Sequence, residues 1–299
     1  MKFSPKSLKS IAPSKSRNFQ NHNLIYMKDY VSPSEKQQIF DYLKTLHPIW
    51  ENRFSASNPP PDGEPNRQLL RPVYWLGNWQ FACLDYYHPP KGMYNRCVDA
   101  EKYPTVLEKI IKKVEGLIKE NFDERDIPNG WHLNTCLINY YGYKTEVLPN
   151  GEAKKIDTAR VGEHKDFELG PIASISFGEK ALFQFVKSAG KSSTSEVILQ
   201  QWLEDSSLQM FGGEKFKKQL FHRVQRVEDK GVVFKGLNTT FFETRRVNFT
   251  FRYVPRDHIA RLTRFPEPLR KDFIPYVTEL ATKSSFWQTE LQEMNELKS

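Results

Sequence analysis

The sequence contains few cysteines and no long apolar run. Its cysteines, Cys83, Cys97 and Cys136, are too few for a disulfide framework and form no Cys-x-x-Cys metal pair. No apolar stretch approaches the roughly 20 residues that a transmembrane helix requires. These absences exclude a disulfide scaffold and indicate a soluble protein with no membrane partner. We expect a reducing compartment, the cytoplasm, with the nucleus or an organelle as alternatives in a eukaryote.

The first 23 residues contain neither Asp nor Glu, and they lack the apolar core of a secretory signal. They are basic and rich in serine. A flexible arm that follows nucleic-acid phosphates is one interpretation of this composition. A plain disordered terminus is the simpler interpretation and the one we favour, and a transit peptide stays open on composition.

The rest of the composition fits a basic globular protein. A chain of 299 residues, 38% hydrophobic and 13% aromatic, suffices for one large domain or two small ones. A mean hydropathy of −0.64 and 27% charged residues favour solubility. The net charge of +8 and the isoelectric point near 9.2 favour a polyanionic partner, above all nucleic acid, although many basic proteins bind none.

Helices are predicted at both ends of the chain. Ser32, Pro33 and Glu35 form a capping box with proline at the first helical position, so a short helix is expected to follow. Apolar residues on one side predict a second helix from about Thr105 to Asn121. Residues 52–68 have the composition of an exposed loop. After Pro255 the composition becomes helical again.

Between residues 133 and 254 the pattern changes to short strands separated by turn residues, which favours a sandwich or jelly roll. Polar loops are expected at about 144–160 and 188–195, and the chain has no internal repeat. The predicted strands are "LNTCLINYY", "PIASISFG", "ALFQFV", "EVILQ", "LQMFGG", "GVVFKG" and "RRVNFTFRYV".

The last of these strands alternates strictly. Arg246, Asn248, Thr250 and Arg252 fall on one face, and the apolar side chains between them fall on the other. A solvated edge strand is the simplest explanation. Against it, the residues between the arginines are polar but uncharged, and a buried guanidinium is costly without a partner. Arginine binds carboxylates in a planar, bidentate manner, so a dicarboxylate would satisfy both groups.

A metal site is predicted from "GEHKDFELG". His164 and Asp166 lie two residues apart on extended backbone, so both side chains point to one side, and His222 lies in a later strand. Two histidines and one carboxylate form the facial triad of non-haem Fe(II) oxygenases. A His-x-Asp pair is common by chance and is usually a surface pair. The arginine strand strengthens the metal interpretation, because such oxygenases bind dianionic 2-oxoglutarate.

Together these segments resemble the AlkB family of Fe(II)/2-oxoglutarate-dependent dioxygenases. "CLINYY" is similar to the family's Asn-x-Tyr motif, "HKDFE" to its His-x-Asp-x-Glu block, and "RVNFTFR" to its closing Arg-x-Asn-x-Thr-x-Arg. "GPIASISFG", "LFQF", "LQMFGG" and "LFHRV" follow in the family order. The resemblance spans roughly Leu24 to Pro255 and is strongest from Cys136 to Val254.

The resemblance implies the site residues. His164, Asp166 and His222 would hold Fe(II), and O2 would be the second cosubstrate beside 2-oxoglutarate. The 2-oxoglutarate ligands would be Asn139, Tyr141, Arg246, Asn248 and Arg252.

The resemblance also implies where a base would bind. Glu168 falls where the family's nucleic-acid demethylases read the edge of a flipped base. An aromatic residue of the amino-terminal lid would cover the base, and we choose Tyr87 or Trp75, although core packing is the simpler role for each. The charged loop between Tyr141 and His164, the segment from His222 to Arg246 and the tail from residue 256 depart from the family pattern and leave the substrate less certain than the chemistry.

The predicted fold is therefore α+β, mainly β, with a double-stranded β-helix (jelly-roll) core, packed as one globular domain. Residues 1–23 would form a basic disordered arm, and residues 24–132 the N-terminal helices and nucleotide-recognition lid. Residues 133–255 would form the catalytic core, and residues 256–299 a helical C-terminal extension.

We hypothesise a monomeric enzyme that removes methyl groups from DNA or RNA bases such as 1-methyladenine and 3-methylcytosine, in repair of alkylation damage, releasing formaldehyde and succinate. The base would be flipped or single-stranded, because iron cannot reach a base inside a duplex. The first alternative is a hydroxylase or demethylase of a protein or small molecule with the same iron core. The second is a jelly-roll binding module that has lost iron, against which the intact ligand positions argue.

Overall fold

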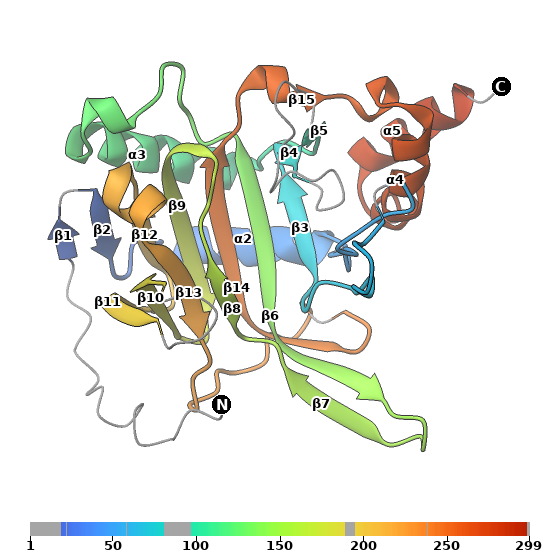
Figure 1. Ribbon diagram of the computed structural model, residues 1–299, viewed down its shortest axis with the longest axis horizontal. Helices are drawn as coiled ribbons and strands as arrows, with labels where there is room; N and C mark the ends of the chain where they lie inside the picture. Colours follow the sequence, from blue (N-terminus) through green and yellow to red (C-terminus); the bar gives the residue numbers. More distant parts are fainter. Residues whose placement is uncertain are drawn as a thin grey trace.

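The computed structural model describes residues 19–21, 23–57, 59–80, 97–188, 195–237 and 239–297. Over these residues the centre of the molecule is an antiparallel major sheet of eight strands, in the order β1-β2-β12-β9-β14-β6-β3, with β7 paired to β6 (Figure 1). Its strands are β1 (Phe19–Asn21), β2 (Leu24–Met27), β3 (Val73–Leu76), β6 (Thr135–Val147), β7 (Ala153–Asp157), β9 (Leu169–Gly178), β12 (Ser207–Phe211) and β14 (Phe242–Tyr253).

A minor sheet forms the second layer of the β core. Its strand order is β11-β10-β13-β8, and its neighbouring strands are antiparallel. The strands are β8 (Val161–His164), β10 (Ala181–Lys187), β11 (Glu196–Leu203) and β13 (Phe221–Gln225). A buried cluster that includes Tyr26, Ile172, Phe185 and Phe211 joins the two sheets. The arrangement confirms the predicted jelly-roll core.

Two helices cover the outer face of the major sheet. Helix α2 (Pro33–Thr45) begins at the predicted capping box, in which the Ser32 hydroxyl accepts from the Glu35 amide and the Glu35 carboxylate accepts from the Ser32 amide. Helix α3 has the predicted bounds, Thr105–Asn121. Both helices bury apolar stripes against the odd-numbered side of β14, where Val247, Phe249 and Phe251 are fully buried. The opposite face of β14 is thereby left to the interior between the sheets.

The C-terminal segment is helical, as predicted. A small third sheet in the order β15-β5-β4 attaches it to the body, and it consists of β4 (Asn78–Trp79), β5 (Cys97–Asp99) and β15 (Ile259–Ala260). Helices α4 (Glu267–Leu280) and α5 (Ser285–Glu296) follow and lie beside β3 and β4 (Figure 1). Their apolar residues belong to the same buried cluster as those of α2 and α3.

Two predicted segments differ in the structure. "GVVFKG", residues 231–236, forms no strand; Gly236 has φ of +87°, and Phe234 instead packs its ring against Phe40. The segment at 144–160 is not a loop, because β6 continues to Val147 and pairs with β7 as a hairpin that extends from the body (Figure 1). The Asn150-Gly151 pair at its turn, with Gly151 at φ of +83°, is a hairpin signal that we missed.

The amino-terminal boundary also differs. Strand β1 lies within residues 1–23, which were expected to form the disordered arm, and it pairs with β2. Strand β2 in turn pairs with β12, so β1 and β2 are both part of the major sheet. Among the described residues, none of the helices is long and apolar enough to span a bilayer.

Candidate active site

The predicted metal ligands converge between the two sheets. His164 ends β8 and lies directly opposite His222 on β13, since the two residues are paired in the strand register. Their ring centroids are 4.2 Å apart, and His222 Nε2 lies 3.1 Å from Asp166 Oδ2. One possible ligand atom from each of the three residues lies within 4.8 Å of the others. Two imidazoles and one carboxylate at this spacing fit Fe(II) and leave coordination positions open for other ligands.

The orientation of His164 suits metal binding. Its Nδ1 lies 2.8 Å from the Gly162 carbonyl oxygen. A carbonyl only accepts, so Nδ1 carries the proton and Nε2 keeps its lone pair for a metal. Burial, and to a smaller extent the neighbouring His222, lower the pKa of His164 to about 4. His164 is therefore neutral at pH 7, which is the form that binds a metal.

Asp166 is fixed by a guanidinium group. Arg252 donates to Asp166 Oδ1 from Nε at 3.0 Å and from Nη2 at 2.8 Å, so Oδ2 faces His222. Burial opposes ionisation of Asp166, but Arg252 and His222 outweigh it and hold the pKa of this carboxyl well below its ordinary value. The carboxylate is thus available as a ligand at neutral pH.

The other end of the polar face of β14 is organised by neutral groups. Arg246 Nη2 donates to Asn248 Oδ1 at 2.8 Å and to Ser176 Oγ at 3.1 Å, and Asn248 Nδ2 donates to Thr250 Oγ1 at 2.9 Å. The guanidinium of Arg246 lies over the ring of Tyr141, 4.7 Å from its centroid. Strand β6 places Asn139 opposite Asn248 and Tyr141 opposite Arg246 in the register of β6 and β14.

A cavity of about 280 Å³ joins these groups. All nine predicted metal, cosubstrate and base-edge residues line it, namely Asn139, Tyr141, His164, Asp166, Glu168, His222, Arg246, Asn248 and Arg252. Glu168 is buried, and its Oε1 lies 3.3 Å from Arg252 Nε. Its Oε2 has no hydrogen-bond partner within the part of the chain that the structure describes. Strand β14 and the segment 164–168 therefore supply the convergent geometry that the sequence pattern predicted.

Of the two aromatic candidates, only Trp75 lies within the described residues, and it does not reach this cavity. Trp75 belongs to the apolar core, and its Nε1 donates to Glu51 Oε1 at 2.6 Å. It does not line the cavity, which agrees with the simpler role of core packing. Tyr87 lies outside the described residues.

Several cavity residues were missed by the sequence reasoning. Arg71 lies just before β3, and Gln80 lies just after β4. Neither belongs to a motif, and only the pairing of β3 with β6 brings this part of the chain to the cavity. Ser176 does not line the cavity itself, but its hydroxyl bonds to Arg246 and Asn248. It stands in "PIASISFG" on the same parity as the cavity residue Ser174, so its direction could have been read from the alternation of that strand.

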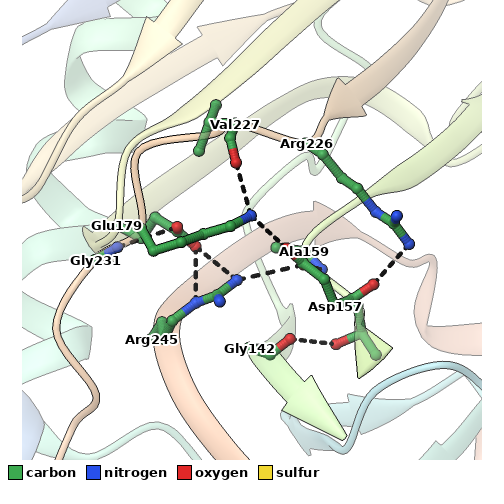
Figure 2. Close-up of polar contacts among 10 residues, drawn as sticks. Gly142, Asp157, Ala159, Glu179, Arg226, Val227, Gly231 and Arg245 are labelled. Carbon is green, nitrogen blue, oxygen red and sulfur yellow. Dashed lines mark hydrogen bonds and ion pairs between the residues drawn. The ribbon is translucent and has the colours of Figure 1, made fainter. Parts of the chain in front are cut away.

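A second group of charged residues supports β8 from outside the cavity (Figure 2). Arg245 donates from Nε to Glu179 Oε2 at 3.2 Å and from Nη2 to Asp157 Oδ1 at 3.3 Å. Lys230 also binds Asp157, whose main-chain oxygen accepts from Arg226 at 2.7 Å. Asp157 ends β7 and precedes β8, so these contacts fix the backbone that leads to His164.

Comparison with known proteins gives the family. The family described as the 2OG-Fe(II) oxygenase superfamily matches residues 23–252. A curated relative, DNA N(6)-methyladenine demethylase ALKBH1D of Arabidopsis thaliana, is 23% identical over 252 residues, which cover 77% of this chain and 49% of the relative. The chain thus matches about half the length of that relative.

Two solved structures are also similar. That of OsALKBH1 is 17% identical with a TM-score of 0.48, covering 79% of this chain and 100% of that chain. The ribosomal oxygenase YcfD of Escherichia coli, in complex with cobalt and succinic acid, is 11% identical with a TM-score of 0.28, covering 92% of this chain and 62% of that chain. The family match covers the minor sheet, the major sheet apart from β1 and the last residue of β14, and every residue of the predicted metal triad. The chain therefore belongs to the 2OG-Fe(II) oxygenase superfamily, as an AlkB-family dioxygenase that uses Fe(II), 2-oxoglutarate and O2.

Proposed function

We propose that this dioxygenase removes methyl groups from nucleic-acid bases that carry an exocyclic amino group. The observation that carries the proposal is the position of Glu168. Its carboxylate is buried in the same cavity as the metal triad, and no described residue forms a hydrogen bond with Oε2. A buried acceptor without a donor is costly, so a ligand that brings a donor is favoured there. The amino groups of adenine and cytosine are such donors, whereas thymine has none.

The roles of the surrounding residues follow from their positions. His164, Asp166 and His222 would hold iron, and Asn139, Tyr141, Arg246, Asn248 and Arg252 would hold 2-oxoglutarate. Iron and 2-oxoglutarate, with O2, supply the oxidant that hydroxylates an N-methyl group, which then leaves as formaldehyde. The protein positions the methyl group and keeps water away from the iron.

The substrates that fit this chemistry are 1-methyladenine and 3-methylcytosine, together with N6-methyladenine, on which the name of the Arabidopsis relative states that it acts. The cavity lies between two sheets, so a base must leave a duplex or come from a single strand to enter it. The net charge of +8 supports a polyanionic substrate.

The test is turnover on defined oligonucleotides. Protein reconstituted anaerobically with Fe(II) is given 2-oxoglutarate, O2 and DNA or RNA carrying one of the three methylated bases, in single-stranded and duplex form. We expect loss of the methyl group by mass spectrometry, with succinate and formaldehyde formed in equal amounts. His164→Ala should abolish all three signals. His132→Ala is the matched control, because His132 Nδ1 also contacts a carbonyl two residues before it but lies outside the cavity.

The role of Glu168 has its own test. Glu168→Gln removes the charge of the acceptor, so kcat/KM for the methylated oligonucleotide should fall by about tenfold to a hundredfold, as for loss of a charged hydrogen bond. The KM for 2-oxoglutarate should change little. Unchanged oligonucleotides together with a hydroxylated peptide or small molecule would instead favour the alternative substrate class.

A further inference from the structure

Three arginines line the cavity, and only one of them is neutralised by acidic groups. Arg252 contacts the carboxylates of Asp166 and Glu168. Arg246 bonds to a hydroxyl and an amide, and no ion pair to it occurs among the described residues. Arg71, which no sequence motif marks, likewise has no ion pair within this part of the chain.

Arg71 contacts two of the predicted cosubstrate ligands. Its Nε donates to Asn139 Oδ1 at 2.8 Å, and its guanidinium carbon lies 4.8 Å from the centre of the Tyr141 ring. The guanidinium of Arg246 lies 4.7 Å from the centre of the same ring. The Tyr141 ring therefore contacts two guanidinium groups, that of Arg246 on β14 and that of Arg71 in the segment before β3.

Because Arg71 and Arg246 are both positively charged and lie over the same ring, each makes binding of an anion beside the other more favourable. Arg246 is buried, and burial together with the charge of Arg71 lowers its pKa, while Tyr141 opposes the shift. Glu179, the acid that acts on Arg246 from further away, is already bound by Arg245. Two guanidinium groups without carboxylate partners in one cavity are costly unless a ligand brings negative charge. Among the described residues, no carboxylate forms an ion pair with either guanidinium group, and Asp166 and Glu168 of the same cavity contact Arg252 instead.

We propose that Arg71 is a further 2-oxoglutarate-binding residue and that it acts with Arg246 on the carboxylate distal to the 2-oxo group. This rests on the cosubstrate site given under the proposed function. Arg252 marks the metal end of the cavity, because it is bonded to Asp166. Arg246 lies six residues along the same strand, which places Arg71 and Arg246 at the opposite end. The 2-oxo acid end of 2-oxoglutarate is the part that chelates iron, so its other carboxylate faces these two arginines.

Arginine suits this position because its planar donors match a carboxylate. With Nε used by Asn139, the terminal nitrogens of Arg71 stay available for the ligand. The competing role for Arg71 is contact with a phosphate of the nucleic acid. The bond to Asn139 and the position over Tyr141 favour the cosubstrate, since both partners belong to the predicted cosubstrate set.

The test measures cosubstrate binding without turnover. Protein loaded with Mn(II), under anaerobic conditions, is titrated calorimetrically with 2-oxoglutarate and with 2-oxopentanoate, which has the same chain length but no distal carboxylate. We expect Arg71→Met to weaken 2-oxoglutarate binding by about tenfold and to leave the weak binding of 2-oxopentanoate unchanged. Arg71→Lys, which keeps the charge without the planar donors, should give an intermediate loss. Arg67→Met is the matched control, because Arg67 is exposed in the same segment and lies outside the cavity.

Each result separates the possibilities. Equal 2-oxoglutarate affinity in Arg71→Met and the wild type overturns the inference, and so does an equal loss for both ligands. An increased KM for the oligonucleotide with unchanged 2-oxoglutarate affinity would assign Arg71 to the nucleic acid. If Arg71→Met does not fold, the ratio of the two affinities in Arg71→Lys decides. Failure of the wild type to turn over any oligonucleotide would refute the proposed substrate but leave the calorimetric result intact.

Discussion

A single guanidinium connects two carboxylates that have different expected roles. Arg252 donates to Asp166 Oδ1 and lies 3.3 Å from Glu168 Oε1. The proposed iron ligand and the proposed base-reading residue are therefore held by one side chain. Both acids alternate inward with His164, while Phe167 between them is 39% exposed. The period of two along this segment thus combines metal binding and substrate contact.

The lowered pKa of the half-buried His164 makes the stability of the metal-free protein depend on pH. Its pKa of about 4 lies below the ordinary value of 6.5. Between these values the unfolded chain takes up a proton that the folded protein does not, so the free energy of unfolding falls as pH falls. Urea denaturation of the metal-free protein at several pH values between 6.5 and 4 measures this slope. We expect His164→Gln to reduce the slope; identical slopes in wild type and variant would contradict the assignment.

At the scale of elements, β14 has a bulge beside two neighbouring arginines, Arg245 and Arg246. The pairing of β14 with β6 shifts register between Thr244 and Arg246. Gly142 on β6 allows this approach, because a Cβ there would lie 1.8 Å from the Glu243 carbonyl oxygen. Arg246 then faces the cavity, and Arg245 enters the ion network behind β8 (Figure 2). Alternation along the strand, with the bulge beside it, thus gives the arginine proposed to bind 2-oxoglutarate and the structural arginine different surroundings.

The network behind β8 should contribute more to stability than a surface ion pair. Arg245 and Glu179 side chains are each 1% exposed, so Glu179→Ala leaves the Arg245 charge poorly compensated in the interior. We expect a loss of about 3 kcal/mol in the free energy of unfolding, measured by urea denaturation. Glu214→Ala is the control; its pair with Lys218 is 59% and 75% exposed, and its loss should stay below about 1 kcal/mol. Similar losses in the two variants would show that the network is not a stabilising element.

At the scale of the whole molecule, the C-terminal helices form one wall of the fold. The Trp79 ring meets the edges or faces of Phe273, Tyr276 and Trp287 at centroid distances of 5.6 to 5.9 Å. Trp79 ends β4, which follows β3 after one residue, and both Trp75 and Trp79 donate their indole N–H to Glu51. Residues as far apart in sequence as Glu51 and Trp287 thus stabilise one edge of the major sheet. This edge lies next to Arg71 and Gln80 of the cavity.

Removing the central aromatic group of this wall should destabilise the protein. Trp287 is 1% exposed, and Trp287→Ala would leave a cavity beside Trp79, at a cost of about 3–5 kcal/mol. A lowered midpoint in thermal unfolding is the expected result. Phe241→Ala, at a site 60% exposed, should change the free energy of unfolding by less than about 0.5 kcal/mol. A Trp287→Ala protein as stable as the wild type would mean that the extension is dispensable for the fold.

The sequence by itself determined the features that depend on local order along the chain. Alternation predicted the two faces of β14, the spacing of His164 and Asp166 predicted a shared direction, and the capping box predicted the start of α2, because neighbouring side chains have fixed directions on a strand or helix. Only the tertiary structure decided what approaches from elsewhere in the chain. It placed Arg71 on Tyr141, buried Trp75 against Glu51 and paired Arg245 with Glu179 and Asp157. These contacts depend on strand register and a bulge, which join residues far apart in sequence and follow no period within it.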